Sequence, residues 1–130
     1  MGWAIHLQSF ENKTISRFKR SVVWDIFGAK AHRTGEGWGL VYGSKNGGVL
    51  CLTDDDLIGG CSVRRPSEDT IRDLYRVAQR VRSAINVEAS FFVADAAFLA
   101  DIPEWLASAL PKPPRVVLSA DELLERVAES

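Results

Sequence analysis

Cysteine and histidine, the residues that most often hold metals or attack substrates, are scarce in this sequence, with two of each. Neither His6 nor His32 has a second ligand at the short spacings typical of zinc sites, so we expect no metal site. Two cysteines do not make a disulfide framework in a chain of 130 residues, and we expect Cys51 and Cys61 to be free thiols. A cross-strand bridge stays open as an alternative, because the two residues would face each other if they paired across a hairpin.

Long apolar runs are also lacking. No stretch approaches the roughly 20 apolar residues of a membrane-spanning helix, so no membrane partner is expected. The opening residues, MGWAIHLQSF, have neither the cationic region nor the long apolar run of a signal peptide. We therefore expect a cytoplasmic protein.

Motifs for nucleotides, calcium and nucleophilic catalysis are absent. The glycines of RTGEGWG (33–39) alternate and lead into a strand, whereas a dinucleotide loop needs G-x-G-x-x-G before a helix. In TDDDLIGGCSVRRP (53–66), counting from Asp54 places Arg65 where a calcium loop needs its acidic twelfth residue. There is no G-x-S-x-G elbow and no cysteine beside a histidine. We expect no cofactor, and we interpret 53–66 as a connection between strands whose acids stay in solvent.

The bulk composition is that of an ordinary globular domain, with 46% hydrophobic and 25% charged residues. Residues 1–130 are expected to form one domain with one core. The net charge of −1 gives no overall attraction to nucleic acid. Residues 1–82 hold 13 Lys and Arg against 9 Asp and Glu, a balance of +4, whereas residues 83–130 hold 3 against 8, a balance of −5. The two parts could form opposed faces or neutralise each other across the fold.

Hydrophobic periodicity predicts an α+β domain with a mixed or antiparallel sheet and helices packed against it, in the order β-α-β-β-β-α-β-α-β-α. The alternation at 3–9 indicates a half-buried strand, and helical spacing between residues 14 and 27 indicates the first helix. Asn46-Gly47 predicts a hairpin between strands at 40–42 and 49–53, and residues 61–65 follow as a third strand.

The second half of the chain carries clear helix starts. Ser67, followed by Glu68 and Asp69, predicts the start of a helix whose apolar face continues to Ile85. A run of β-formers at 87–94 predicts a strand. Further elements are expected in this order: two short helices within 96–110, a strand at 115–119, and a last helix that begins with a capping box at Ser119–Glu122.

Arg72, Arg76 and Arg80 recur every four residues and form one stripe on the predicted helix, a pattern that can grip phosphates. Acidic residues three or four positions earlier offer intrahelical partners to two of them. Interleaved aromatic residues for stacking on bases are missing apart from Tyr75. We interpret the stripe as a solvated face, with an RNA or partner surface as the alternative, and we do not expect nucleic acid as the partner.

From GGCSVRRPSEDTIRDLYRVAQRVRSA to PRVVLSADELLERV, roughly residues 60–130, the chain resembles small bacterial immunity proteins, the partners of toxins. The likeness consists of a strand that ends in Arg-Pro, an acid-capped helix, and a late strand followed by a Ser-capped terminal helix. Proteins of that class have no catalytic site and occlude a toxin, often through acidic side chains. The resemblance implies such a role here, but it includes no functional motif that assigns individual residues.

The residues we predict to bind a partner are acidic or aromatic. Asp54, Asp55 and Asp56 form one acidic cluster, and Glu104 stands beside Trp105 in the acidic last third. An aromatic residue surrounded by acids is typical of a hot spot that binds a basic partner. We therefore predict a non-enzymatic, protein-binding module of the inhibitor or immunity type that covers a basic partner.

Two alternatives stay open. The first is a small hydrolase or transferase that uses Cys51 or His32 in a pocket assembled only by the fold. The second is a homodimer formed through the exposed edge of the predicted three-stranded meander.

Overall fold

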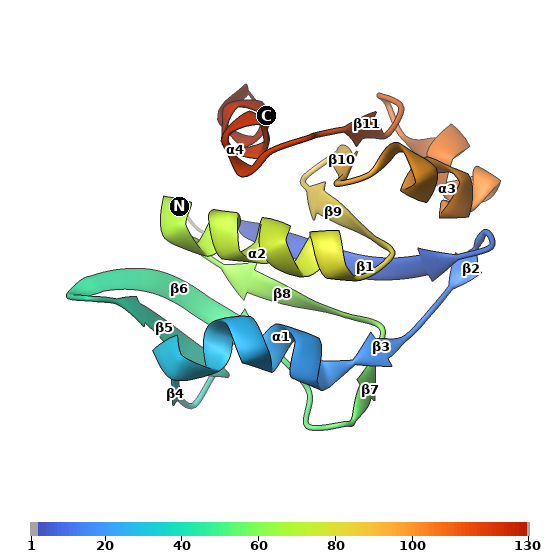
Figure 1. Ribbon diagram of the computed structural model, residues 1–130. Coiled ribbons are helices and arrows are strands. Elements are labelled where there is room, and N and C mark those ends of the chain that lie inside the picture. Colours follow the sequence, from blue (N-terminus) through green and yellow to red (C-terminus); the bar gives the residue numbers. More distant parts are fainter. Residues whose placement is uncertain (1–2, 130) are drawn as a thin grey trace.

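One large sheet is the framework of the molecule. The computed structural model describes residues 3–129, and its nine-stranded sheet has the order β11-β10-β9-β1-β8-β6-β5-β4, with β2 paired to β1 beside this path (Figure 1). The pairings in this sheet are antiparallel except for the parallel pair of β10 and β11. A second sheet pairs β3 with β7. The strands are β1 (Ala4–Glu11), β2 (Thr14–Ile15), β3 (Phe18–Lys19), β4 (Ala31–Arg33), β5 (Trp38–Tyr42), β6 (Lys45–Cys51), β7 (Leu57–Ile58), β8 (Gly60–Arg64), β9 (Ser83–Val87), β10 (Ser90–Val93) and β11 (Arg115–Val116).

The helices cover the two faces of the sheet unequally. They are α1 (Arg20–Phe27), η1 (Gly28–Lys30), α2 (Glu68–Arg80), η2 (Ala96–Asp101), α3 (Glu104–Ala109) and α4 (Ala120–Glu129). The apolar residues of α1, α2 and α4 pack into the main core on one face. Those of η2 and α3 pack on the opposite face, over β9, β10 and the end of β1. The predicted class, a single α+β domain with helices packed against a mixed sheet, is confirmed.

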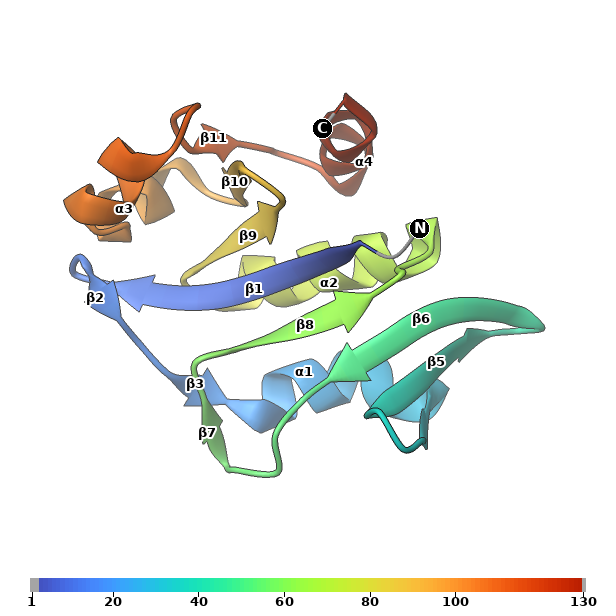
Figure 2. The same ribbon diagram turned by 180° about the vertical axis from the view of Figure 1, so that it is seen from behind.

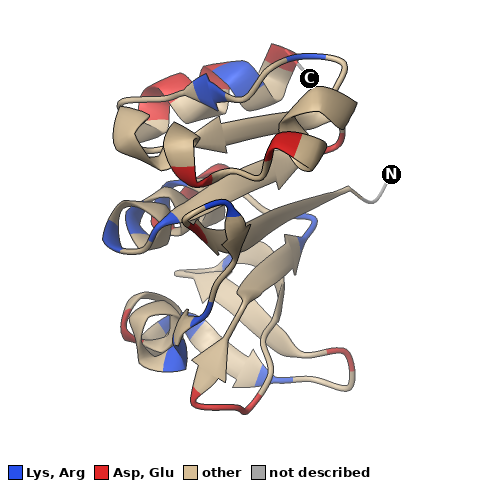
Figure 3. Ribbon diagram, turned by 90° about the vertical axis from the view of Figure 1, so that its right-hand side faces the viewer, with Lys and Arg blue, Asp and Glu red and all other residues tan. Residues whose placement is uncertain are grey.

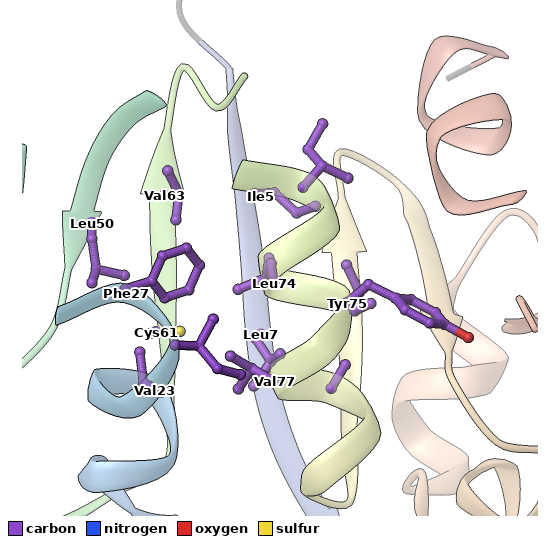
Figure 4. Packing of buried hydrophobic residues seen from close by; sticks show 14 of the residues in the cluster. Ile5, Leu7, Val23, Phe27, Leu50, Cys61, Val63, Leu74, Tyr75 and Val77 are labelled. Carbon is purple, nitrogen blue, oxygen red and sulfur yellow. The ribbon is translucent and has the colours of Figure 1, made fainter. Parts of the chain in front are cut away.

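Alternation along the strands builds the main core. In β1, Ile5 and Leu7 are buried under the helices while His6 between them is exposed, as the period of two at 3–9 predicts. Figure 4 shows the side chains of α1 and α2, among them Phe27 and Leu74, pointing toward those of β1, β6 and β8. The predicted start of α2 is confirmed, because the Ser67 side chain accepts a hydrogen bond from the backbone N–H of Thr70.

The first helix is shorter than predicted. It begins at Arg20, whereas the apolar spacing predicts it from residue 14. Asn12 and Lys13 adopt positive φ values of 52° and 64° and turn the chain back, so that Thr14–Ile15 pairs with the end of β1. Phe18–Lys19 then pairs with Leu57–Ile58 from a distant part of the chain. Strand pairing thus prevails over a short helical pattern, and it leaves Ile15 65% exposed.

Two turns also lie elsewhere than predicted. The β5–β6 hairpin turns at Gly43-Ser44 rather than Asn46-Gly47, since Tyr42 pairs with Lys45 and Gly43 has a φ of 66°. Gly47 lies inside β6 instead, where a Cβ atom would stand 2.6 Å from the Tyr42 ring. The run at 87–94 is not one strand, because β9 ends at Val87 and β10 begins at Ser90.

The C-terminal end of α2 also differs from the prediction. Helix α2 ends at Arg80, so Ile85 belongs to β9 rather than to the helix. The two short helices within 96–110 and the final helix are confirmed, and the Ser119 hydroxyl accepts from the N–H of Glu122 at 3.1 Å. The late strand is limited to Arg115–Val116.

A buried carboxylate ties the helices to the far half of the sheet. Asp73 on α2 is 6% exposed and accepts hydrogen bonds from Lys30 of η1, from the Tyr42 hydroxyl at 2.7 Å and from Arg76 at 3.2 Å. Burial, followed by the hydrogen bond to Asp73 and its negative charge, raises the pKa of Tyr42 above its usual value. Tyr42 therefore stays a neutral donor.

We expect Asp73→Ala to lower the free energy of unfolding by about 3 kcal/mol, because it leaves the Lys30 ammonium and the Tyr42 hydroxyl without their acceptor. Urea denaturation at pH 7 measures the loss. The control is Asp69→Ala, which removes the same charge from an exposed position on the same helix. A loss no larger than that of the control would show that the network contributes little.

Burial raises the pKa of Cys61 to about 12, and the nearby Cys51 adds to the shift. The unfolded thiol ionises near pH 8.5, so this contribution to stability is complete below that pH and is lost as pH rises toward 12. Between pH 8 and pH 10 we expect wild-type protein to lose about 2 kcal/mol more than Cys61→Ala, measured by urea denaturation at both pH values. Parallel pH dependences would contradict the assignment.

Candidate protein-binding surface

The predicted acidic cluster lies in the connection between β6 and β7, as expected for a solvent-exposed turn. Asp54, Asp55 and Asp56 are all exposed. The start of α1 holds this loop in place, because the Arg20 side chain donates to the Thr53 carbonyl at 2.8 Å and the Arg20 N–H donates to the Asp56 carbonyl at 2.9 Å. The Arg20 guanidinium also lies 3.9 Å from the Asp54 carboxylate. Asp55 and Asp56 have no ion-pair partner among the described residues, so their charges are available to another molecule.

The second predicted pair, Glu104 and Trp105, opens helix α3. Trp105 is 65% exposed, the largest aromatic side chain left in solvent among the described residues. The Lys13 ammonium donates to the Glu104 carboxylate at 2.8 Å. This hydrogen bond, together with the positive charge, holds the pKa of Glu104 below its usual value. The acid beside the tryptophan is therefore already paired within the fold.

The two predicted patches occupy opposite ends of one side of the molecule. In Figures 1 and 2, α3, β2, β3 and β7 follow one another along the same edge of the ribbon, and Figure 3 looks onto that edge. We call this edge, with Ile15, Leu57, Trp105 and the 54–56 loop, the α3–β7 side. Ile15 and Leu57 are 65% and 51% exposed. The structure thus places the predicted residues on one side without joining them into one continuous cluster.

The charge of the α3–β7 side is mixed rather than uniformly acidic. Arg17, just before β3, and Lys19, within β3, are both exposed and lie between the two acidic patches. Two hollows, each of about 490 Å³, lie at the end of this side that carries the 54–56 loop. Asp56 and Leu57 border both, together with Trp24 and Lys19 in one and Arg17 and Asp55 in the other.

The charges of the basic first part and the acidic last third of the sequence partly pair with each other in the fold. Three ion pairs join the basic first part to the acidic last third: Lys13–Glu104, Arg72–Asp121 and Arg82–Asp101. The two parts therefore neutralise each other at these three acids. The acidic balance of residues 83–130 does not translate into a single acidic face.

The arginine stripe is also partly paired. Arg72 binds Asp121 of α4 at 2.6 Å, and Arg76 binds Asp73 at 3.2 Å. The intrahelical partner predicted three residues before Arg76 is confirmed, whereas Arg72 pairs with another helix rather than with Glu68. Arg80 has no ion-pair partner within residues 3–129.

A second uncovered region is the face of β1, β8 and β6 that points away from α1 and α2 (Figure 2). Its side chains are mostly small or polar, and none is buried: Ala4, His6, Gln8, Val49, Cys51, Ser62 and Arg64. The register aligns Cys51, Ser62 and His6 in one row across three strands. A hollow of about 340 Å³ lies over this row.

The two cysteines point to opposite faces of the sheet. Cys51 pairs with Ser62 and shares its face, whereas the next residue, Cys61, points into the main core (Figure 4). Both thiols are free, as predicted, and the cross-strand bridge is ruled out by this register.

His32 and Cys51, the residues of the enzyme alternative, do not meet. His32 lies opposite Gly39 on β5, which lies opposite Val49 on β6, two residues before Cys51. Neither side chain has a hydrogen-bond partner among the described residues, so no second polar group orients the thiol or the imidazole. Within residues 3–129, no three potential metal ligands of the His, Cys, Asp and Glu types stand together.

No family model matches the chain, and no curated protein or solved structure is significantly similar to it. The resemblance to immunity proteins therefore stays a prediction. Among the described helices, none combines the length and the apolar character needed to cross a bilayer.

Sequence reasoning missed three residues of the α3–β7 side: Lys13, Ile15 and Leu57. Ile15 fits the apolar face of the helix predicted from residue 14, and only its pairing in β2 reveals its exposure. The contact between Lys13 and Glu104 joins residues 91 positions apart, and no local pattern signals it. Leu57 follows three aspartates, and that neighbourhood was the one available hint of exposure.

We expect Cys51 to react with an aromatic disulfide reagent at pH 8 at least ~100-fold faster than Cys61, because Cys61 is buried and its raised pKa keeps it protonated. Absorbance measures the released thiolate, and peptide mapping assigns the labelled residue. Cys51→Ser should remove the fast phase and leave the slow one. Two equally fast thiols would contradict the placement of Cys61 in the core.

Proposed function

We propose that this protein is a non-enzymatic binding module of the inhibitor or immunity type, which covers a basic surface of a partner protein with its α3–β7 side. The observation that carries the proposal is the exposure of large apolar side chains there: Trp105, Ile15 and Leu57 are 65%, 65% and 51% exposed. Exposed aromatic and aliphatic residues beside polar ones are characteristic of protein interfaces, whose binding energy concentrates in a few such anchors.

The charges favour a basic partner over an acidic one. The free carboxylates of Asp55 and Asp56 directly precede Leu57, and two cations of this side, Arg20 and Lys13, already have ion-pair partners within the fold. Carboxylates at the rim of an interface steer a cationic partner and raise its association rate. Arg17 and Lys19 lie between the patches, so we expect the partner to be basic opposite the 54–56 loop rather than over its whole surface.

We expect both ends of the α3–β7 side to contribute to affinity. Trp105→Ala should weaken binding by about 2 kcal/mol, or roughly thirty-fold, if the tryptophan is a hot spot. Replacement of Asp54, Asp55 and Asp56 by lysine should abolish capture of the partner by the tagged protein from native lysate. Titration calorimetry with the captured partner then gives the dissociation constants.

The matched control is the triple variant Asp25→Lys, Glu88→Lys and Glu125→Lys, which makes the same charge change at exposed positions outside this side. It should retain the partner in equimolar amount. Equal loss of the partner in both triple variants would show a general charge effect and contradict the proposal. Recovery of the chain alone as a dimer, detected by light scattering, would favour the homodimer instead.

A further inference from the structure

Helix α3 is fastened to the rest of the molecule by very little. Among the described residues, the contact between Lys13 and Glu104 is the one hydrogen bond that links residues 103–114 to the remainder of the chain. The others are local, such as those from the N–H groups of Leu106 and Ala107 to the Pro103 carbonyl. The connector that follows contains Pro111, Pro113 and Pro114, which have no N–H to donate.

Packing holds α3 no more firmly than hydrogen bonding does. The helix has six residues and none of them is buried, whereas α2 buries seven of its thirteen. Leu106 and Ala107 rest half-buried on the second apolar cluster, which consists of Phe10, Ala84, Val93 and Ile102. A helix this short is unstable in water without tertiary contacts. Its free energy of local opening should therefore lie well below that of the whole domain.

Helix α4 provides the contrast. It follows the same proline-rich connector, but its Leu123 is fully buried and its Asp121 pairs with Arg72. The carbonyl of Val117, just before it, accepts a hydrogen bond from the buried Tyr75 hydroxyl at 2.7 Å. The chain is thus anchored on both sides of α3, at the buried Pro103 and at β11, while α3 itself is not.

The residue that holds α3 sits in an unfavourable backbone conformation. Lys13 has a φ of 64° in the two-residue turn between β1 and β2, at a position where this type of turn prefers glycine. The side chain of Lys13 extends from that turn to Glu104. Glu88 in the β9–β10 turn has a similar φ of 52°, but its side chain makes no ion pair among the described residues.

From these observations we propose that residues 104–114 form a flap, held closed by the ion pair between Lys13 and Glu104, that opens while the rest of the domain stays folded. Opening uncovers the apolar cluster around Phe10 and Val93, on the same face as the bare strands β1 and β8. The flap also carries Trp105. The proposal concerns the isolated chain and holds whether or not the α3–β7 side binds a basic partner.

Hydrogen exchange followed by mass spectrometry on the intact chain tests the flap. The amides of residues 104–110 should exchange at least ten-fold faster than those of α2, at a urea concentration far below the unfolding transition. Addition of 0.5 M NaCl should increase their exchange further, because it screens an exposed ion pair. If the amides of α3 were protected from exchange as strongly as those of α2, the proposal would be overturned.

Two glycine variants separate the ion pair from the backbone strain. Lys13→Gly and Glu88→Gly each relieve a positive φ, so both should keep or raise the urea midpoint. Lys13→Gly alone should speed the exchange of residues 104–110, by about two- to five-fold, the range expected for an exposed ion pair. The salt effect should also vanish in that variant. If the amides of α3 exchanged at the same rate in both variants, the ion pair would not be what holds α3.

Discussion

The buried carboxylate of Asp73 is the interaction on which the arrangement of the two halves of the sheet depends. Strand β6 pairs with β8 over only three residues, from Val49 to Cys51, so backbone hydrogen bonding alone joins β4, β5 and β6 loosely to the rest. Asp73 adds a second connection, because it binds Tyr42 of β5 and Lys30 of η1 from its place on α2. Because Asp73 itself is buried, its carboxylate needs these donors in place, which fixes how the helix layer sits on the sheet.

A second hydrogen bond strengthens the same connection between α2 and the far strands. The Thr70 hydroxyl, one turn before Asp73, donates to the carbonyl of Gly47 in β6, and Gly47 itself lets the Tyr42 ring approach the strand. The residues of this connection thus depend on one another: Gly47 allows the Tyr42 ring to pack against the strand, and the Tyr42 hydroxyl reaches Asp73. This mutual dependence explains why Asn46-Gly47, the strongest turn signal in the sequence, lies in a strand instead. The close approach of the Tyr42 ring requires glycine at position 47 for a reason unrelated to turning.

Elements whose signals are local could be predicted from the sequence, and those defined by distant pairing could not. The Ser67 and Ser119 caps and the alternation of β1 involve neighbours within four residues, and each is found where expected. The start of α1 depends instead on Phe18–Lys19 pairing with Leu57–Ile58, about 40 residues away. The candidate site divides in the same way. The exposure of Asp54–Asp56 follows from composition, but the pairing of Glu104 with Lys13 and the exposure of Ile15 follow only from the fold.

The unequal coverage of the two sheet faces gives the molecule regions of different stability. On the face under α1, α2 and α4, each inward side chain of β1 and β8 is buried, and disturbance of that layer must expose the main core. On the opposite face, the small and polar side chains of β1 and β8 need no cover, so nothing there braces α3 from the side. The second apolar cluster, around Phe10 and Val93, is therefore small and has few neighbouring residues. If the α3–β7 side binds a partner as proposed, the weakly held α3 with its exposed Trp105 is where adaptation is least costly, while Asp73 keeps the helix layer and the far strands fixed.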